Sequence, residues 1–233
     1  MCVSTILKLG DADPFYGEQF KAFSAKFEYK ADMLKLKVVA ITSAIAGEGK
    51  TLACVNLAMN LASAGRKKVL LIDVDLRKAD LARVLNIPPL PGVSEFLSET
   101  VGLKDILRNS IVPGMYVIAA GTRIAAPAAL LAGDKFRHFL VKIRDHFDVI
   151  LLDTPPILPV ADTLNLKDQV DGFIFLYRTG FTPYNMLKQA IEEIGEKNVI
   201  GVVLNGVEPK KEKYYQRYYG KYYRKANKED PSI

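Results

Sequence analysis

Two shortages limit what this chain can be. It has only two cysteines, Cys2 and Cys54, which cannot build a disulfide framework and are typical of a reducing compartment. It also has no long hydrophobic run: its longest uncharged stretch is 51–65, whereas about 20 apolar residues are needed to span a bilayer. The first residues lack a charged-then-apolar leader. We therefore expect a cytoplasmic chain rather than a secreted or membrane-spanning one.

Common catalytic constellations are missing as well. The two histidines, His138 and His146, have no cysteine or glutamate at metal-ligand spacing, so we expect them to be solvated or packing residues. No G-x-S-x-G nucleophile elbow occurs. The sequence therefore indicates neither a zinc centre nor a serine hydrolase.

What is present is an ordinary globular composition with one biased end. Hydrophobic residues make up 49% and charged residues 25% of the 233 residues, which suits one α/β domain with a small appendage at most. The formal net charge is +6. Residues 208–233 hold eight Lys or Arg against four acids, so this tail carries +4 and the rest of the chain +2.

Strand and helix patterns alternate along the body. Several expected strands are continuous Val-, Ile- or Leu-rich runs, which is typical of strands buried on both faces. We expect strands at 37–42, 68–73, 115–119, 148–153, 172–177 and 199–204, and helices at 51–64, 78–85, 94–108, 134–146, 160–169 and 183–196. This alternation predicts an α/β fold with a mostly parallel sheet flanked by helices on both faces, and functional loops at the strand ends.

A glycine loop lies at the centre of this pattern. Residues 47–51, Gly-Glu-Gly-Lys-Thr, follow a β-branched run and precede an apolar helical segment, which is the context of a phosphate-binding loop. Backbone N–H groups and the helix N-terminus would surround the phosphates, Lys50 would reach the β- and γ-phosphates, and the Thr51 hydroxyl would bind Mg²⁺. The full pattern asks for glycine where this chain has Ala44. The alternative is a tight turn with a surface lysine.

Aspartates end two of the expected strands. Alternation places Asp73 and Asp75 on one side, where a cation with a phosphorylated ligand would offset their repulsion; the alternative is that Asp75 caps the next helix. Asp153 follows an apolar run in the Walker B manner, in which the acid holds Mg²⁺ directly or through water. With the glycine loop, these carboxylates predict a P-loop NTPase.

Two flanking segments are less ordinary. Phe20, Phe23 and Phe27 form an apolar stripe on a helix expected at 18–36, which packs either on its own domain or on a neighbouring subunit. The tail interleaves tyrosines with Lys and Arg, so we expect it to be mobile and to serve as a nucleic-acid or anionic-lipid patch, an interaction helix or a set of phosphate acceptors. The tyrosines are Tyr214, Tyr215, Tyr218, Tyr219, Tyr222 and Tyr223.

Together these features resemble the bacterial tyrosine kinases (BY-kinases) of capsule and exopolysaccharide synthesis, over nearly the whole chain from Glu18. The matching motifs are residues 49–51 (Gly-Lys-Thr), 73–77 (Asp-x-Asp-x-Arg, Walker A′), 152–156 (Leu-Asp-Thr-Pro-Pro, Walker B) and the tyrosine cluster. The resemblance implies an ATP-dependent protein-tyrosine autokinase that phosphorylates its own tail between subunits and regulates capsule or exopolysaccharide synthesis and export.

The resemblance also implies cofactors, partners and roles. ATP and Mg²⁺ would be the cofactors. A membrane-embedded activator or polysaccharide co-polymerase, a tyrosine phosphatase and further copies of the chain would be the partners, with no nucleic acid. The activator would hold the cytoplasmic chain at the inner face of the membrane. The implied residues are Lys50, Asp73, Asp75 and Asp153 for catalysis; Ala46, Gly47, Glu48, Gly49, Lys50, Thr51 and Leu52 for ATP; Thr51, Asp75 and Asp153 for the metal; and the six tail tyrosines as phosphate acceptors.

Some assignments depend on chemistry or on departures from the family pattern. A phenol has a pKa of about 10, so a nearby acceptor helps, and Asp73 is our choice for that base. Lys21 and Ser24 stand where the family has arginines that build ring oligomers. Lysine cannot reproduce a bidentate arginine contact, so the sequence does not decide whether a ring oligomer forms. Asn205, at the end of the last expected strand, either reads adenine or forms a turn.

The expected organisation has three parts. Residues 1–35 form a lead and a helix with a possible subunit contact, 36–207 an ATP-binding kinase domain and 208–233 a basic tyrosine-rich tail. A partitioning or site-selection ATPase is the main alternative, although Ile45 replaces its signature lysine. A non-catalytic nucleotide-binding regulator is the other.

Overall fold

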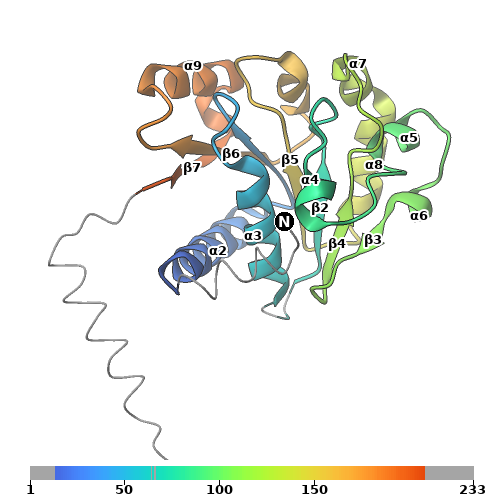
Figure 1. The fold of residues 1–233 in the computed structure, drawn as a ribbon, viewed down its shortest axis with the longest axis horizontal. Coiled ribbons are helices and arrows are strands. Elements are labelled where there is room, and N and C mark those ends of the chain that lie inside the picture. The colour runs from blue at the N-terminus through green and yellow to red at the C-terminus, as the bar shows by residue number, and fades with distance from the viewer. Residues whose placement is uncertain (1–13, 64, 66, 208–233) are drawn as a thin grey trace, which may run out of the picture.

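One sheet lies between two layers of helices (Figure 1). The computed structural model describes residues 14–63, 65 and 67–207. Within them, seven strands follow the order β3-β4-β2-β5-β1-β6-β7, all parallel except β3, which pairs antiparallel with β4. The strands are β1 (Val38–Ser43), β2 (Val69–Asp73), β3 (Arg108–Asn109), β4 (Met115–Ile118), β5 (Val149–Asp153), β6 (Gly172–Arg178) and β7 (Val199–Asn205).

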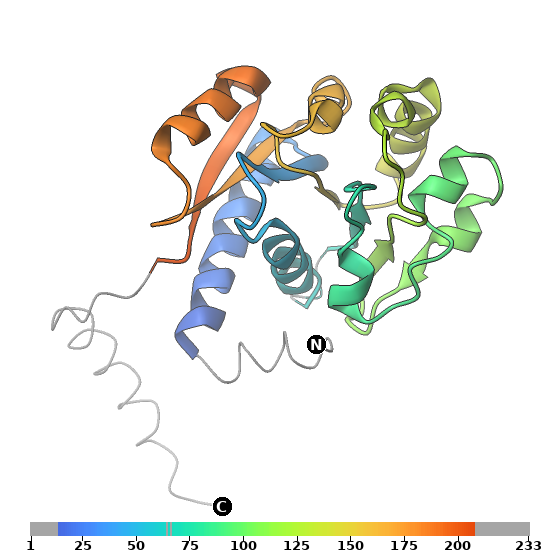
Figure 2. The ribbon, with the colours of Figure 1, turned by 45° about the horizontal axis from the view of Figure 1, so that its top comes forward.

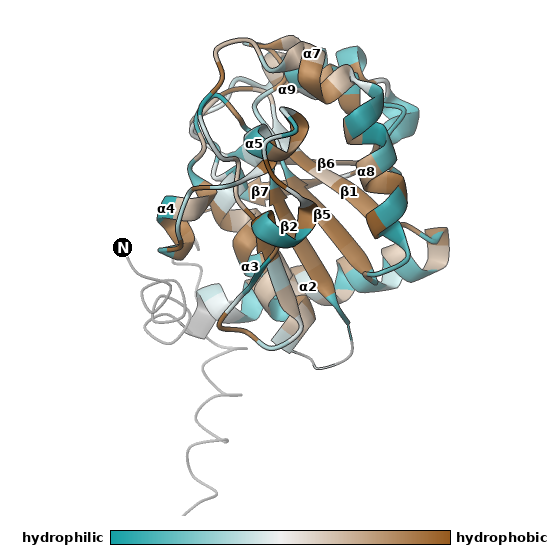
Figure 3. Ribbon diagram, turned by 90° about the vertical axis from the view of Figure 1, so that its right-hand side faces the viewer, coloured by the Kyte–Doolittle hydropathy of each residue, from teal (hydrophilic) through white to brown (hydrophobic). Residues whose placement is uncertain are grey.

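Helices cover both faces of this sheet. The α-helices are α2 (Pro14–Leu34), α3 (Lys50–Ser63), α4 (Leu81–Leu85), α5 (Val93–Leu97), α6 (Leu103–Ile106), α7 (Ala128–Ala132), α8 (Asp134–Arg144) and α9 (Tyr184–Ile194), with 3-10 helices η1 (Ala161–Leu166) and η2 (Glu196–Asn198). Apolar strands line the middle layer and polar residues the outer helix surfaces (Figure 3). Strands β1, β2 and β5 are therefore buried on both faces, as the apolar runs predict, whereas the edge strand β7 is partly exposed.

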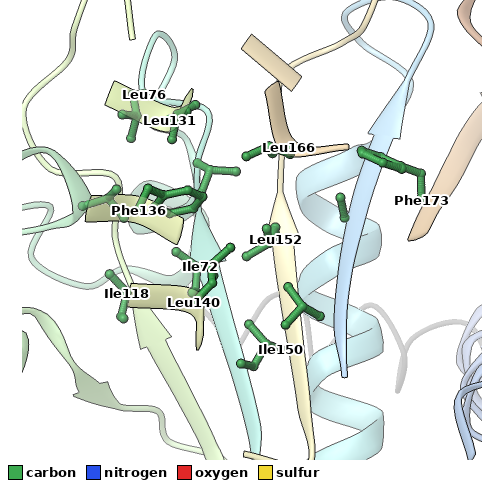
Figure 4. Packing of buried hydrophobic residues seen from close by; sticks show 14 of the residues in the cluster. Ile72, Leu76, Ile118, Leu131, Phe136, Leu140, Ile150, Leu152, Leu166 and Phe173 are labelled. Atoms are coloured by element: carbon green, nitrogen blue, oxygen red, sulfur yellow. The ribbon is translucent and has the colours of Figure 1, made fainter. Parts of the chain in front are cut away.

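Two core clusters fill the space between the layers. Alternation along β1 sends Val38 and Ala40 into a cluster with α7, α8 and α9, and Val39 and Ile41 into a cluster with α2, α3 and α4. Figure 4 shows the first cluster, in which the sheet side chains Ile72, Ile150 and Leu152 pack with Phe136 and Leu140 of α8. The two clusters fix β1, β5 and β2 side by side, and the functional motifs follow these three strands.

The predicted elements are confirmed with four corrections. Helix α2 spans Pro14–Leu34 instead of 18–36, and α4 begins at Leu81 instead of residue 78, because Lys78 lies in a turn and Ala79 has a φ of 54°. Each expected strand is present to within one residue at either end. The helix predicted at 94–108 is wrong: the chain forms α5 and α6 instead, because Glu99 takes a left-handed conformation (φ 62°) and the Gly102 N–H is capped by the Asp105 carboxylate at 2.8 Å. The segment predicted as a helix at 160–169 is the 3-10 helix η1. Strand β3 and helix α7 were not predicted.

The aromatic stripe of α2 packs inside its own domain. Phe27 is 4% exposed, and Phe20 and Phe23 are partly buried against the cluster with α3. Figures 1 and 2 show α2 running beside α3. The structure therefore shows internal packing for this stripe, and the subunit contact stays a prediction. The lead at 1–13 and the tail at 208–233 lie outside the described residues.

Candidate active site

The phosphate-binding loop, residues 44–51 and called the P-loop below, leaves β1 and enters α3 at Lys50. Gly47 and Gly49 have φ of +87° and +93°, which side chains with a Cβ rarely adopt, so both positions require glycine. Ala44 has no positive φ, and its methyl group is buried in the core. The loop therefore keeps its shape without the glycine that the full pattern asks for at 44.

Two strand-end carboxylates lie beside this loop. Strand β5 lies between β1 and β2, and its Asp153 is in register with Ile41 on one side and Asp73 on the other. Asp73 is fully buried, and its two oxygens accept hydrogen bonds from the N–H groups of Asp75 and Leu81, each at 3.1 Å. Asp73 thus caps the first residue of α4, and the Asp75 carboxylate, the sequence's alternative for this role, accepts the N–H of Lys78 at 3.1 Å in the turn before that helix. Asp75 itself is half-buried.

Burial dominates the electrostatics of these groups. Burial raises the pKa of Asp153 to about 7, against a hydrogen bond from the Thr51 side chain and the charge of Lys50, both of which lower it. Burial and then the charge of Asp153 raise the pKa of Asp73 well above its ordinary value. Burial lowers the pKa of Lys50, and nearby carboxylates, led by Asp153, oppose that shift. An added cation would therefore stabilise the ionised carboxylates.

The residues present suit a magnesium ion. The Oδ1 atom of Asp153 is buried and accepts no hydrogen bond from the described residues, so one carboxylate oxygen beside the P-loop has a free coordination site. The half-buried Thr51 hydroxyl adds a second oxygen. No group of three or more His, Cys, Asp or Glu side chains suited to a metal occurs in the described part of the chain. The two oxygens of Asp153 and Thr51 fit Mg²⁺, which is bound through one or two protein oxygens and otherwise keeps water and phosphate ligands.

Arg77 links the Walker A′ segment by hydrogen bonds to the segment that follows Walker B. Its Nε and Nη2 atoms donate to the two carboxylate oxygens of Asp162, at 2.5 and 3.0 Å, and its Nη1 donates to the carbonyl of Ala125. Asp162 is 1% exposed. Sequence reasoning listed Arg77 as a motif residue but missed Asp162, which the motif pattern does not contain.

Asn205 lies against the P-loop. Its Nδ2 donates to the carbonyl of Glu48 at 2.8 Å, and its Oδ1 accepts the N–H of Gly206 at 2.9 Å. Asn205 is the last residue of β7, and both the turn-forming role and adenine recognition stay predictions. Ile45, at the position of the alternative family's signature lysine, packs partly buried against the core.

The remaining expected site residues divide by location. Ala46 and Leu52 lie on the P-loop and in the first turn of α3. The six tail tyrosines lie outside the described residues, so their role as acceptors stays a prediction. His138 is an exposed residue whose Nδ1 contacts the carbonyl of Asp134 at 2.7 Å, and Cys54 is a buried free thiol. No helix among the described residues is both long and apolar enough to cross a membrane.

The fold and the loop first define a class: this is a P-loop NTPase. Residues 36–175 match the AAA domain family. The septum site-determining protein MinD of Pyrococcus horikoshii shares the fold, with a TM-score of 0.60 at 19% identity over 72% of this chain and 68% of that one.

Two further comparisons narrow the class. Over 200 residues the chain is 33% identical to the tyrosine-protein kinase CpsD of Streptococcus pneumoniae serotype 4, covering 84% of this chain and 87% of the relative. The solved BceF tyrosine kinase domain is 30% identical with a TM-score of 0.77, covering 86% of this chain and 82% of that one. The chain belongs to the bacterial tyrosine kinases.

Proposed function

We propose that this kinase transfers the γ-phosphoryl group of ATP to tyrosines of its own tail, in another copy of the chain. The observation that carries the proposal is the placement of Lys50 at the N-terminus of α3, buried and within the electrostatic influence of Asp153, whose Oδ1 atom has no hydrogen-bond partner among the described residues. This arrangement suits positioning and charge stabilisation, which are the main requirements of phosphoryl transfer. The proposed acceptors are Tyr214, Tyr215, Tyr218, Tyr219, Tyr222 and Tyr223.

The P-loop supplies the binding of ATP in this proposal. N–H groups of residues 46–52 surround the phosphates at the positive end of α3. Lys50 stabilises charge on the transferred group, and its neighbouring carboxylates oppose the lowering of its pKa by burial. Thr51 and Asp153 hold Mg²⁺, with Asp75 as an outer partner. When bound, the ion neutralises charge on the β- and γ-phosphate oxygens.

The acceptor phenol must lose its proton as its oxygen bonds to the γ-phosphorus and the bond to ADP breaks. We assign that proton to Asp73, whose raised pKa suits a base. Its two backbone hydrogen bonds hold the carboxylate in place and leave lone pairs free, because a carboxylate has about four acceptor sites. Asp75, half-buried on the same segment, is the competing candidate.

The wider setting is also a proposal. A kinase of this family would regulate capsule or exopolysaccharide synthesis and export from the cytoplasmic face of the membrane. A membrane-embedded activator or polysaccharide co-polymerase would bring it there, a tyrosine phosphatase would reverse its action, and it would act as a homo-oligomer. The family resemblance supports each of these partners.

The test measures phosphotyrosine formed by the purified chain with ATP and Mg²⁺. Lys50→Met should lower the rate by about 100-fold or more, because it removes a charge aimed at the transferred group. Lys104→Met, the same change at an exposed residue of α6, is the matched control and should stay active. Undiminished phosphorylation in Lys50→Met would refute the site.

Two comparisons in the same assay refine the assignment. Asp73→Asn should lose more of the rate than Asp75→Asn if Asp73 is the base, and the reverse order would move that role to Asp75. ATP hydrolysis by the wild type without any phosphotyrosine would instead support an ATPase of the partitioning type.

A further inference from the structure

Glu48 is a buried charge in the middle of the P-loop. Its side chain is 0% exposed, although Ala46 and Gly47 beside it are exposed. Burying a carboxylate is costly unless hydrogen bonds replace its water. Here Oε2 accepts the N–H of Ile45 at 2.9 Å, while Oε1 accepts the Thr182 hydroxyl at 2.6 Å. Protein donors therefore serve both oxygens.

The donors come from segments that are far apart in the sequence. Ile45 is the second residue of the P-loop, whereas Thr182 belongs to the connection between β6 and α9, 134 positions after Glu48. The N–H of Arg178, at the start of that connection, donates to Oε1 at 3.2 Å. The guanidinium of Arg178 donates to the carbonyl of Gly47 at 3.1 Å. The connection thus touches the P-loop at two successive residues.

We infer that Glu48 is a positioning residue whose carboxylate, held by Thr182 and Arg178, keeps the P-loop in the shape that receives phosphates. Loop N–H groups that converge on a phosphate have no partner before it binds, so the free loop needs other contacts to keep that shape. A carboxylate that faced the nucleotide would repel its phosphates. Glu48 avoids this repulsion because its side chain is buried against Thr182 and Arg178. This inference rests on the proposed function, because it concerns the step in which the kinase binds its nucleotide.

Thr182 offers the sharpest test because its hydroxyl can be removed without changing the volume of the side chain. Thr182→Val deletes the donor, and Thr182→Ser keeps it. Thr179→Val is the matched control, because Thr179 is exposed in the same connection and its hydroxyl makes no hydrogen bond to the described residues. Glu48→Gln replaces one acceptor oxygen by an amide group that cannot accept.

The first measurement is the affinity of each folded variant for a fluorescent ADP analogue with Mg²⁺, below its melting temperature. Thr182→Val should bind about tenfold more weakly, as expected for the loss of a hydrogen bond to a charged group. Glu48→Gln should lose at least as much. Thr182→Ser should bind within about threefold of the wild type and Thr179→Val should match it. In phosphorylation assays the KM for ATP should rise in Thr182→Val, with little change in kcat.

The second measurement needs no nucleotide, so it separates this inference from the proposed function. Amide hydrogen exchange of residues 44–51 in the free protein should be faster in Thr182→Val than in Thr179→Val or the wild type. Unchanged exchange in Thr182→Val, or equally weak nucleotide binding by Thr182→Val and Thr182→Ser, would overturn the inference. A wild type that forms no phosphotyrosine but shows the exchange difference would refute the kinase reaction alone.

Discussion

Asp153 is the residue on which the site depends most. Its carboxyl is buried, one of its oxygens has no hydrogen-bond partner in the part of the chain that the structure describes, and its pKa is raised to about 7 from the ordinary 3.8. Folding alone does not favour such a group in its ionised form. A function that brings a cation to this oxygen explains why the position is not apolar.

The first prediction follows from the sign of that shift. A carboxyl whose pKa is higher in the folded state stabilises the fold most below pH 3.8, and this contribution is lost as the pH rises through 7. Asp153→Asn removes the ionisation. Without Mg²⁺ and nucleotide, the variant should therefore melt at a higher temperature than the wild type at pH 8, with a difference that shrinks toward pH 5.

Thermal melts in a chelating buffer at several pH values measure this difference. Asp134→Asn, at an exposed aspartate, is the control and should show no such trend. A difference between Asp153→Asn and the wild type that does not change with pH would contradict the raised pKa.

At the scale of elements, local signals predicted most of the fold. The strands are confirmed because continuous apolar runs identify them without tertiary information. The helix predicted at 94–108 is wrong because apolar spacing continued across Glu99 and Gly102, where backbone conformation and a side-chain cap end one helix and begin another. The Arg77–Asp162 and Glu48–Thr182 contacts were missed because their partners are 85 and 134 positions apart. Such contacts exist only in the folded chain.

The second prediction concerns the link between Walker A′ and η1. Asp162→Asn removes the charge that accepts both hydrogen bonds of the Arg77 guanidinium and should lower the free energy of unfolding by about 1–3 kcal/mol. Urea denaturation measures it. Asp134→Asn breaks only an exposed ion pair with Arg137, so its effect should stay within about 0.5 kcal/mol. Equal effects of the two variants would show that the Arg77–Asp162 pair contributes no more than a surface contact.

The third prediction concerns the stripe of α2. Phe27→Ala should lower the free energy of unfolding by about 3–5 kcal/mol, because Phe27 is 4% exposed and packs in the cluster with α3. Tyr29→Ala, on the same helix at 72% exposure, should change it by about 0.5 kcal/mol or less. Sedimentation should be unaffected in both. If Phe27→Ala instead keeps normal stability but sediments as a smaller species than the wild type, the stripe forms a subunit contact.

At the scale of the whole molecule, the site and its proposed substrate are separate parts of the chain. The strand order brings the P-loop, Asp153 and Asp73 together at one edge of the sheet, as the motifs predicted. The tail carries +4 of the net charge of +6 and the six tyrosines. A basic segment is attracted to a site lined with carboxylates, so the tail of a second copy has an electrostatic reason to enter it.

The most direct test mixes two full-length variants, one without a working site and one without the tail tyrosines. One protein is Lys50→Met with an intact tail, and the other has an intact site and all six tail tyrosines changed to phenylalanine. After incubation with ATP and Mg²⁺, site-resolved mass spectrometry should find phosphate on the tail tyrosines of the Lys50→Met chain, and none when that chain is incubated alone. An unmodified tail in the mixture, while the wild type alone is phosphorylated there, would contradict transfer between subunits. An unmodified tail in both would contradict the kinase assignment of this site.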